Sequence, residues 1–505
     1  MMDENEKTDT LLESVSETSE EKTVEKVKQP NKMGVMPIPK LVIIMALPLM
    51  LSLLVQSLYN IVDGIFVGKI SEEAFSATSL AYPVQLLMIA VSVGTGVGVN
   101  AVCSRMVGAK KLGDASNAAT TGLIVSLIGT GVFMLFGVAL VPVYTKLCSG
   151  SEGTLKMCES YLRICTIGCL GVFMETLGQR LLQATGKTLL SMVSLVVGAV
   201  TNLVLDPLFI FVFNMGIEGA AVATVIGQWV GAGIALTFHF VLNKEIKIAF
   251  KGFKFRKDIV WSIFKVGLPT MLTQAMGSIM LFSMNAVLGA LLPGINENGI
   301  ANSTPAIAFF GGYYKLQNFL YMPIIGLGQA AIPIVGFNFG AKNPDRIKQV
   351  VKVSVPIAAV FALLGTILFE AIPGQLLGIF SASEDALRIG RVGLRIIAAT
   401  FVFGSVTTVL GYTCSGLGNG LVNMIGTALR QALPLIPLAY LFGKIGGVDL
   451  IWYSLWVSEI LATAYAVFFT LREFKKKISK IEKSEQIKEN PIEISEENLK
   501  LKEEV

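Results

Sequence analysis

Long apolar runs without charge are the feature that most constrains this chain. Residues 41–62 hold no charged side chain, and further runs of similar character follow along the sequence. A helix that crosses the hydrocarbon core of a bilayer needs about 20 such residues, and it satisfies its own backbone polar groups. The 505 residues are 53% hydrophobic and only 15% charged, more apolar than an ordinary globular chain. The sequence therefore predicts an all-α polytopic membrane protein.

The apolar runs predict twelve spanning helices on the criterion of about 20 residues each. They are centred roughly on residues 53, 92, 130, 172, 200, 230, 271, 318, 360, 401, 431 and 461. Loops rich in Lys and Arg alternate with loops that contain acids and few bases. The basic segments are 104–114, 243–258, 339–349 and 472–480. The positive-inside rule then places both termini in the cytoplasm of a multi-pass cell-membrane protein.

An internal repeat divides the body into two halves of six helices. Residues 94–110 (GTGVGVNAVCSRMVGAK) align with residues 326–342 (GLGQAAIPIVGFNFGAK) at an offset of 232 positions. Six spans per half make corresponding helices cross in the same direction, so the repeat is parallel, as in transporters whose two lobes enclose a cavity. We expect an N-lobe over residues 38–247 (helices 1–6) and a C-lobe over residues 248–472 (helices 7–12).

The two ends of the chain differ from this body. Residues 1–37 and 473–505 are rich in Glu, Lys and Ser and poor in aromatic residues. Such segments bury too little apolar surface to order themselves, so we expect a disordered cytoplasmic tail at 1–37 and a charged cytoplasmic tail at 473–505. The first residues carry acids where a signal peptide needs bases, so we expect no cleaved targeting segment.

Polar residues of the first half fall at one depth of the membrane. Asp206 and Thr224 lie about nine residues on either side of a turn near Gly216, and Asp63 lies about eight residues before its own external loop. At 1.5 Å per residue, all three are about 12 Å from the outer surface. Asn202 precedes Asp206 by four residues and shares its helix face.

This set of oxygens suits a small cation. Asp206, Asn202 and Thr224 could bind Na⁺, or a proton could sit on one carboxylate whose neighbour is also a carboxylate. Pro207 cannot donate a backbone hydrogen bond, so it bends its helix and frees a carbonyl one turn earlier. Acids inside a membrane span are costly and usually functional, although structural hydrogen bonding is the alternative.

The second half offers a weaker set of candidates for a substrate cavity. Lys315 and Gln317 lie among aromatic residues that include Tyr314, and Met276, Met280 and Met284 form a stripe on helix 7. Lys315 could face the cavity or an internal partner, and a Met stripe can line a pocket or simply pack. Other charged residues lie nearer helix ends or can pair, and we interpret them as structural: Arg180, Lys265, Arg391, Arg395, Arg430, Glu370 and Glu459.

Histidine and cysteine usage excludes several functional classes. The single histidine, His239, and the six cysteines show no metal-ligand spacing, and a membrane-embedded enzyme would need a nucleophile or metal set. Cys148 and Cys158 could share an external loop, and whether they pair stays open. We expect no catalytic residues, no cofactor and no nucleic-acid partner.

Ordered motifs along the body resemble the multidrug and toxic compound extrusion (MATE) family. They are VDGIFVGKI (62–70), SRMVGAKK (104–111), LLQATGK (181–187), TNLVLDP (201–207) and GAAVAT (219–224). The resemblance covers about residues 38–471, and YYKLQNFLYMP (313–323) further resembles the bacterial branch of small multidrug exporters.

The resemblance implies twelve helices in two lobes and the export of amphipathic, often cationic drugs or toxic metabolites in exchange for H⁺ or Na⁺. It also implies a monomer in the lipid bilayer and a coupling site at Asp63, Asn202, Asp206 and Thr224, with Gln179 where the family commonly has Asn. Another branch of the family carries an acidic cation site in helices 7 and 10. This sequence has no acid within either of these two helices. The alternatives are a flippase for a lipid-linked saccharide, which would need a cluster of cavity cations, and a receptor or scaffold without transport.

Overall fold

A computed structural model describes residues 31–148, 151–292, 303–378, 384–479 and 481. All regular structure within these ranges is helical, as predicted. The first half contains α2 (Lys32–Val35), α3 (Ile38–Gly68), α4 (Glu72–Gly108), α5 (Leu112–Leu135), η1 (Phe136–Leu140), α6 (Val141–Leu147), α7 (Glu152–Ile167), α8 (Leu170–Ala184), α9 (Thr188–Pro207), η2 (Leu208–Val212) and α10 (Gly216–Leu242).

The second half contains a corresponding series of helices. They are α11 (Lys257–Leu291), α12 (Thr304–Gly340), α13 (Pro344–Ala371), α14 (Pro373–Gly378), α15 (Glu384–Ala398), α16 (Phe401–Gly416), α17 (Gly420–Gln431), α18 (Leu435–Ile451), α19 (Tyr453–Glu473) and η3 (Phe474–Ile478). In both halves the prefix η marks a π-helical turn that continues the α-helix before it.

The number of spans agrees with the twelve predicted from the apolar runs. Ten helical segments of the described chain are long and apolar enough to cross a membrane. Two helix pairs, α7 with α8 and α15 with α16, pass the same test together but are bent by 45° and 50°, and counting each pair as one span gives twelve. Large apolar side chains remain on the outside, such as Phe282 at 77% exposure, which is the surface a bilayer requires.

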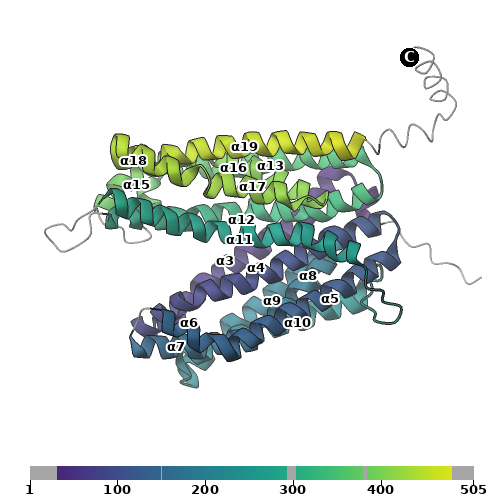
Figure 1. Cartoon of the computed structure of the whole chain (residues 1–505), viewed down its shortest axis with the longest axis horizontal. Coiled ribbons are helices and arrows are strands. Elements are labelled where there is room, and N and C mark those ends of the chain that lie inside the picture. The colour runs from purple at the N-terminus through teal and green to yellow at the C-terminus, as the bar shows by residue number, and fades with distance from the viewer. Residues whose placement is uncertain (1–30, 149–150, 293–302, 379–383, 480, 482–505) are drawn as a thin grey trace, which may run out of the picture.

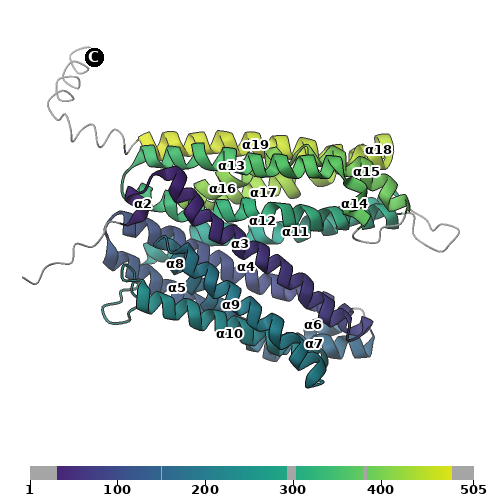
Figure 2. The same ribbon diagram turned by 180° about the vertical axis from the view of Figure 1, so that it is seen from behind.

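The helices form two bundles, one from each half of the chain (Figure 1). The bundles come together at the end where α2 lies and stand apart at the end that carries α6 and α7, and the view from behind shows the same arrangement (Figure 2). Between the bundles, α4 packs against α11 while α3 packs against α12. We call the two bundles the N-lobe and the C-lobe, and their junction the closed end.

The closed end depends on glycines of the internal repeat. A Cβ on Gly108 of α4 would collide with the backbone of Phe337, and one on Gly340 of α12 would collide with the backbone of Arg105. Both pairs are related by the repeat offset of 232, so the contact is reciprocal about a pseudo-twofold axis. Lys110 and Lys342, which follow these glycines, both adopt a positive φ, near 60° and 58°. The predicted parallel repeat is therefore confirmed in the backbone.

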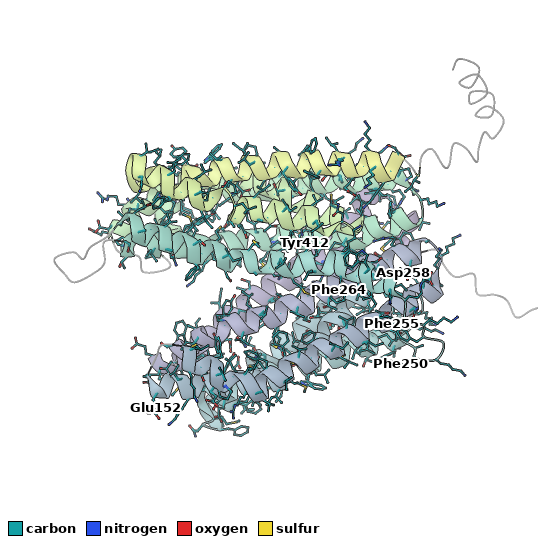
Figure 3. All side chains as sticks on the ribbon, in the orientation of Figure 1. Glu152, Phe250, Phe255, Asp258, Phe264 and Tyr412 are labelled. Atoms are coloured by element: carbon teal, nitrogen blue, oxygen red, sulfur yellow. The ribbon has the colours of Figure 1, made fainter. Side chains whose placement is uncertain are left out.

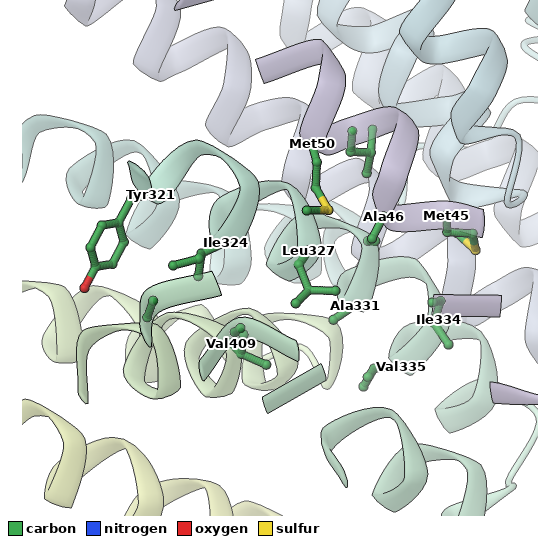
Figure 4. Packing of buried hydrophobic residues seen from close by; sticks show 14 of the residues in the cluster. Met45, Ala46, Met50, Tyr321, Ile324, Leu327, Ala331, Ile334, Val335 and Val409 are labelled. Carbon is green, nitrogen blue, oxygen red and sulfur yellow. The ribbon is translucent and has the colours of Figure 1, made fainter. Parts of the chain in front are cut away.

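Apolar side chains fill the junction between α3 and α12. Met45, Ala46 and Met50 from α3 face Leu327 and Ala331 of α12 within one buried cluster (Figure 4). These residues belong to different halves of the chain, so the largest core of the protein is shared by both lobes.

The folded part of the chain begins earlier than the predicted tail allows. Residues 31–36, which the sequence places within the tail, form α2 and its caps. The Asn31 amide donates to both carboxylate oxygens of Glu245, at 3.0 and 2.8 Å, and Arg346 Nη2 donates to the carbonyls of Met33 and Met36. The segment is ordered because both lobes supply partners for it. The expected disorder of residues 1–30 lies outside the described residues.

Two charged residues interpreted as structural form a buried ion pair in the C-lobe. Arg430 Nε lies 2.6 Å from Glu459 Oε1, and the guanidinium stacks 4.2 Å from the ring centroid of Tyr321. Desolvating either charge alone inside a membrane protein is costly, so the pair neutralises itself. All six cysteines lie in the described part of the chain and are free thiols, Cys148 and Cys158 included.

The reciprocal glycine contact can be tested by adding one methyl group. We expect Gly108→Ala and Gly340→Ala each to lower the free energy of unfolding by about 1–3 kcal/mol, because backbone atoms cannot move aside as a side chain can. Thermal unfolding of the purified protein in detergent measures this. Gly113→Ala is the control, since no atom lies within 4 Å of its added Cβ. Equal melting temperatures for all three variants would contradict the contact.

Candidate functional site

Four residues predicted to form a site are brought together in the N-lobe. Asp206 of α9 is fully buried. The side-chain amide of Asn202, one turn earlier, donates to Asp206 Oδ1 at 3.2 Å and to Thr224 Oγ1 of α10 at 3.4 Å. Asp63 of α3 places its carboxyl group within hydrogen-bonding range of the Asp206 carboxyl group. Three helices therefore supply one cluster, at the common depth that residue counting indicated.

One oxygen of each carboxyl group in this cluster lacks a donor from the described residues. Asp63 Oδ1 and Asp206 Oδ2 are buried, and no donor among the described residues reaches them. Two ionised carboxylates this close repel each other strongly in a medium of low dielectric constant. A proton between them relieves the repulsion, and so does a cation such as Na⁺ held by oxygen ligands. The arrangement is chemically a site for one small positive charge.

Local sequence explains why α9 and α10 present these side chains to each other. Small residues let the two helices approach closely, since a Cβ on Gly227 would lie 2.9 Å from Asn202 Cβ. After Asp206 the chain reaches Pro207 and continues as the π-helical turn η2. The connection to α10 then needs left-handed backbone, with Asn214 at φ 53° and Gly216 at φ 57°. The bend predicted at Pro207 is thus a change of helix type.

A cavity of about 130 Å³ lies inside the N-lobe beside this cluster. It is lined from α3, α4, α8, α9 and α10, extends along α9 from Ser191 to Asn202, and also includes Gln329 of the C-lobe helix α12. This volume holds roughly four waters at about 30 Å³ each. It is smaller than the pockets of about 300 Å³ or more that take drug-sized ligands. The cavity suits water and ions, and Asn202 joins it to Asp206.

Glu175 is a third N-lobe carboxylate, and the sequence analysis did not single it out. It lies on α8, lines the cavity, and accepts a hydrogen bond of 3.0 Å from the Gln179 amide. The carboxylate packs against α10, where a Cβ on Gly231 would lie 2.5 Å from Glu175 Oε1. Gln179 therefore lines the cavity as a partner of Glu175. The signal was present in the sequence, because Glu175 is an acid within the fourth apolar run, as Asp63 is within the first.

Tyr59 is near Glu175 and near the aspartate pair. It lines the cavity from α3, one turn before Asp63, and it interacts electrostatically with Glu175, Asp63 and Asp206. Together with water in the cavity, a phenol in this position can relay hydrogen bonds between the three acids. The N-lobe thus holds three acids that all interact electrostatically with one phenol.

A group of polar side chains that line the cavity joins the two lobes. Arg180 of α8 is buried, and its Nη1 donates to Gln183 Oε1 at 2.9 Å and to Gln329 Oε1 of the C-lobe at 3.0 Å. Gln329 also hydrogen bonds to Tyr412, which Figure 3 places in the C-lobe helices next to the N-lobe. Arg180, interpreted from sequence as structural, therefore links the lobes.

The predicted substrate-cavity residues lie apart from this cavity. Gln317 and Met280 are buried in the C-lobe, with exposures of 8% and 2%, and Met280 belongs to the apolar core. Met276 and Tyr314 are half-buried and Lys315 is exposed. None of the five lines the N-lobe cavity, so their role in binding substrate stays a prediction. Across the described residues, no three His, Cys, Asp or Glu side chains converge on a metal-sized point.

Comparisons with known proteins agree with this architecture. The family model MatE matches residues 48–208 and 269–441. Multidrug export protein MepA of Staphylococcus aureus (strain MSSA476) is 25% identical over 444 residues, which cover 86% of this chain and 95% of MepA. The MepA of Staphylococcus haemolyticus (strain JCSC1435) is 25% identical over 433 residues, 84% of this chain and 91% of that protein.

Solved structures with the same fold give the same result. An outward-facing multidrug resistance MATE family transporter of the MOP superfamily has a TM-score of 0.81 and 24% identity, covering 91% of this chain and all of that one. A MOP superfamily transporter from Pyrococcus furiosus Vc1, described as having a binding pocket of reverse polarity, has the same TM-score, identity and coverage. At 24% identity, this structural similarity establishes the fold and not the function.

The position of Glu175 can be tested by a double-mutant cycle with Gly231. Gly231→Ala pushes a methyl group onto the carboxylate, so we expect a loss of about 1–3 kcal/mol in unfolding free energy. In a Glu175→Ala background the same change should cost much less, and coupling of at least 0.5 kcal/mol is expected for residues in contact. Gly233→Ala is the control, with no atom near its Cβ. Additive effects in thermal unfolding would contradict the contact.

Proposed function

Because this chain belongs to the MatE family, we propose that it is a multidrug efflux antiporter of the cell membrane. It exports amphipathic, often cationic compounds in exchange for H⁺ or Na⁺, with both termini in the cytoplasm. The observation that carries the proposal is the contact between the carboxyl groups of Asp63 and Asp206, in which Asp63 Oδ1 and Asp206 Oδ2 are buried and have no donor among the described residues. Such a pair must take up a positive charge to be stable, and that requirement couples an ion to conformation.

The coupling step follows from the helices that carry the pair. Asp63 belongs to α3 and Asp206 to α9, and α3 also packs on α12 of the C-lobe. When an H⁺ or Na⁺ enters from outside, the two carboxyl groups attract one cation instead of repelling each other, so α3 and α9 draw together. Pro48 lies inside α3, where it interrupts the helical hydrogen bonds and allows a bend. The bend changes the contact of α3 with α12 and favours outward release of substrate.

The membrane potential contributes to this exchange whenever net positive charge enters in a cycle. Each net positive charge that enters per cycle through 100 mV is worth about 2.3 kcal/mol, which sustains roughly a fiftyfold concentration ratio of substrate. Export of a monovalent cation against a single H⁺ or Na⁺ moves no net charge, so that exchange draws on the concentration gradient of the ion. Glu175 is a third N-lobe carboxylate and lines the cavity, and Tyr59 interacts electrostatically with it and with both members of the pair. We include it in the coupling site, which allows a second cation per cycle.

Substrate binds between the lobes rather than in the N-lobe cavity, which is too small for a drug. Of the predicted substrate residues in the C-lobe, Lys315 is exposed and Tyr314 and Met276 are half-buried, so these three can supply aromatic and polarizable groups for varied ligands, whereas Gln317 and Met280 lie buried behind them. A lipid-linked saccharide flippase is the alternative, and it requires unpaired cations in the cavity. In the N-lobe, which faces the proposed substrate site, the Arg180 guanidinium donates to Gln183 and Gln329, and Glu175 and the aspartate pair oppose an anion, so export of cations is favoured.

Neutralising the aspartate pair should uncouple transport. We expect Asp63→Asn and Asp206→Asn each to reduce uptake of a fluorescent cation into inverted membrane vesicles at least tenfold, because an amide cannot exchange a proton or bind Na⁺ as a carboxylate does. Imposing a pH gradient and a Na⁺ gradient separately identifies the coupling ion.

Glu218→Gln is the matched control, because Glu218 is an exposed acid on α10. Gradient-driven uptake equal to wild type in either aspartate variant, at equal protein abundance, would refute the coupling role.

Glu175→Gln should lower the steady-state gradient rather than abolish transport. If Glu175 carries a second cation, removing it reduces the charge moved per cycle by one, and at 100 mV the substrate ratio falls by up to about fiftyfold. The measurement is the limiting accumulation in vesicles at a fixed potential. Glu152→Gln, an exposed acid on α7, is the control. A limiting ratio identical to wild type would assign Glu175 a purely structural role.

A further inference from the structure

A second pocket, of about 260 Å³, lies at the closed end of the molecule. It is separate from the N-lobe cavity and shares no lining residue with it. Both lobes contribute: Arg105 comes from α4 of the N-lobe, whereas Lys265 comes from α11 and Lys477 from η3 of the C-lobe. We call it the basic pocket. Figure 3 marks the two ends of the molecule: Phe250, Phe255 and Asp258 lie at the closed end, whereas Glu152 lies at the opposite end.

The three cations of the basic pocket carry more positive charge than their protein partners neutralise. Lys477 interacts electrostatically with both Arg105 and Lys265. The acid beside them is Glu473, whose Oε2 lies 2.7 Å from Lys477 Nζ and whose Oε1 accepts from Asn419. One carboxylate against three cations leaves a net charge of about +2, and like charges this close repel each other.

Arg105 contributes a buried donor, its Nε, that has no hydrogen-bond acceptor among the described residues. Its guanidinium lies 5.8 Å from the ring centroid of Phe339. It also lies against Gly418, where a φ of 81° favours glycine, so that no Cβ occupies the space taken by the guanidinium. The side chain is thus held in place by packing. A buried donor left unsatisfied costs about 1–3 kcal/mol or more when charged.

The rim of the pocket places it at the membrane surface. Trp261 lies one turn before Lys265 on α11, lines the pocket and is 70% exposed. Tryptophan is enriched at the level of lipid headgroups, and basic pockets between helices at this level bind phosphate-bearing headgroups. Guanidinium and ammonium groups are the usual ligands of phosphate in proteins.

We propose that the basic pocket binds a phosphate group, from an anionic phospholipid headgroup or from free inorganic phosphate, and that this phosphate ties the two lobes together at the closed end. The cations come from both lobes, so an anion between them replaces repulsion by attraction only while the lobes touch. A ligand that binds one conformation better shifts the population toward it. The bound phosphate therefore holds the transporter closed at this end.

Binding is measured first, because it does not depend on the proposed transport function. The purified full-length protein is examined by native mass spectrometry and thermal unfolding with phosphatidylglycerol, with phosphatidylcholine, and with inorganic phosphate against chloride at equal ionic strength. We expect retention of phosphatidylglycerol and a raised melting temperature. An effect of inorganic phosphate alone identifies the free anion as sufficient, whereas an effect of phosphatidylglycerol alone identifies the lipid.

The matched variants are Lys265→Gln and Lys475→Gln. Lys265 is exposed at the pocket, so its replacement should fold, and Lys475 is an exposed lysine of η3 that does not line it. We expect Lys265→Gln to weaken binding about fivefold, the usual contribution of one cation near an anionic surface, and Lys475→Gln to leave it unchanged. No stabilisation by either ligand, or equal weakening in both variants, would overturn the proposal.

The effect on the lobes is measured by the distance between spin labels at the closed end. Lys111→Cys and Lys342→Cys label exposed positions of the N-lobe and C-lobe, in a background with Cys148→Ser because the other cysteines are buried. Phosphatidylglycerol should increase the short-distance population in the labelled protein and do so about fivefold less in Lys265→Gln. An unchanged distribution on adding lipid would refute the tie between the lobes while leaving a transport defect of the Asp63 variants unaffected.

Discussion

The structure depends on the direct contact between α4 and α12, where two glycines allow backbone to touch backbone. Gly108 lies against Phe337 and Gly340 lies against Arg105. Without a hydrophobic driving force between helices inside lipid, close packing of small residues is the main source of association. The contact fixes how the lobes meet, and it also positions Arg105, whose backbone touches Gly340 while its guanidinium lines the basic pocket. The repeat places equivalent residues on both sides, so each helix supports the other.

Buried charge is handled differently in the two lobes. In the C-lobe, Arg430 and Glu459 neutralise each other at 2.6 Å. In the N-lobe, Asp63 and Asp206 face each other, and Glu175 accepts only a neutral amide among its described hydrogen bonds. A self-neutralised pair is stable in both states of a transport cycle and has no need of an ion. A pair of acids needs a cation, so in the proposed function the chemistry that responds to a gradient belongs to the N-lobe.

Several polar links gather at or near the closed end and have to separate when the lobes move apart there. Arg180 of the N-lobe donates a hydrogen bond to Gln329 of the C-lobe beside the cavity. The segment that contains α2 is hydrogen bonded to Glu245 and to Arg346 of the C-lobe. The basic pocket is the third link and the one whose strength varies with an outside ligand. The balance between conformations that are closed and open at this end thus depends partly on direct hydrogen bonds and partly on whether the basic pocket holds an anion.

The sequence by itself determined the membrane architecture, the repeat and the depth of the main polar cluster. Apolar run length and basic loops depend on the bilayer, and helical rise places Asp63, Asp206 and Thr224 at one level before any packing is known. Only the tertiary structure decided which side chains meet at that level. Gln179 and Glu175 are four residues apart on α8, a spacing that the sequence already gives. The bridge from Arg180 to Gln329 and the grouping of Arg105, Lys265 and Lys477 instead join residues far apart in the chain. Their proximity follows from the rotation of each helix about its axis and from close glycine contacts, which periodicity within one helix does not specify.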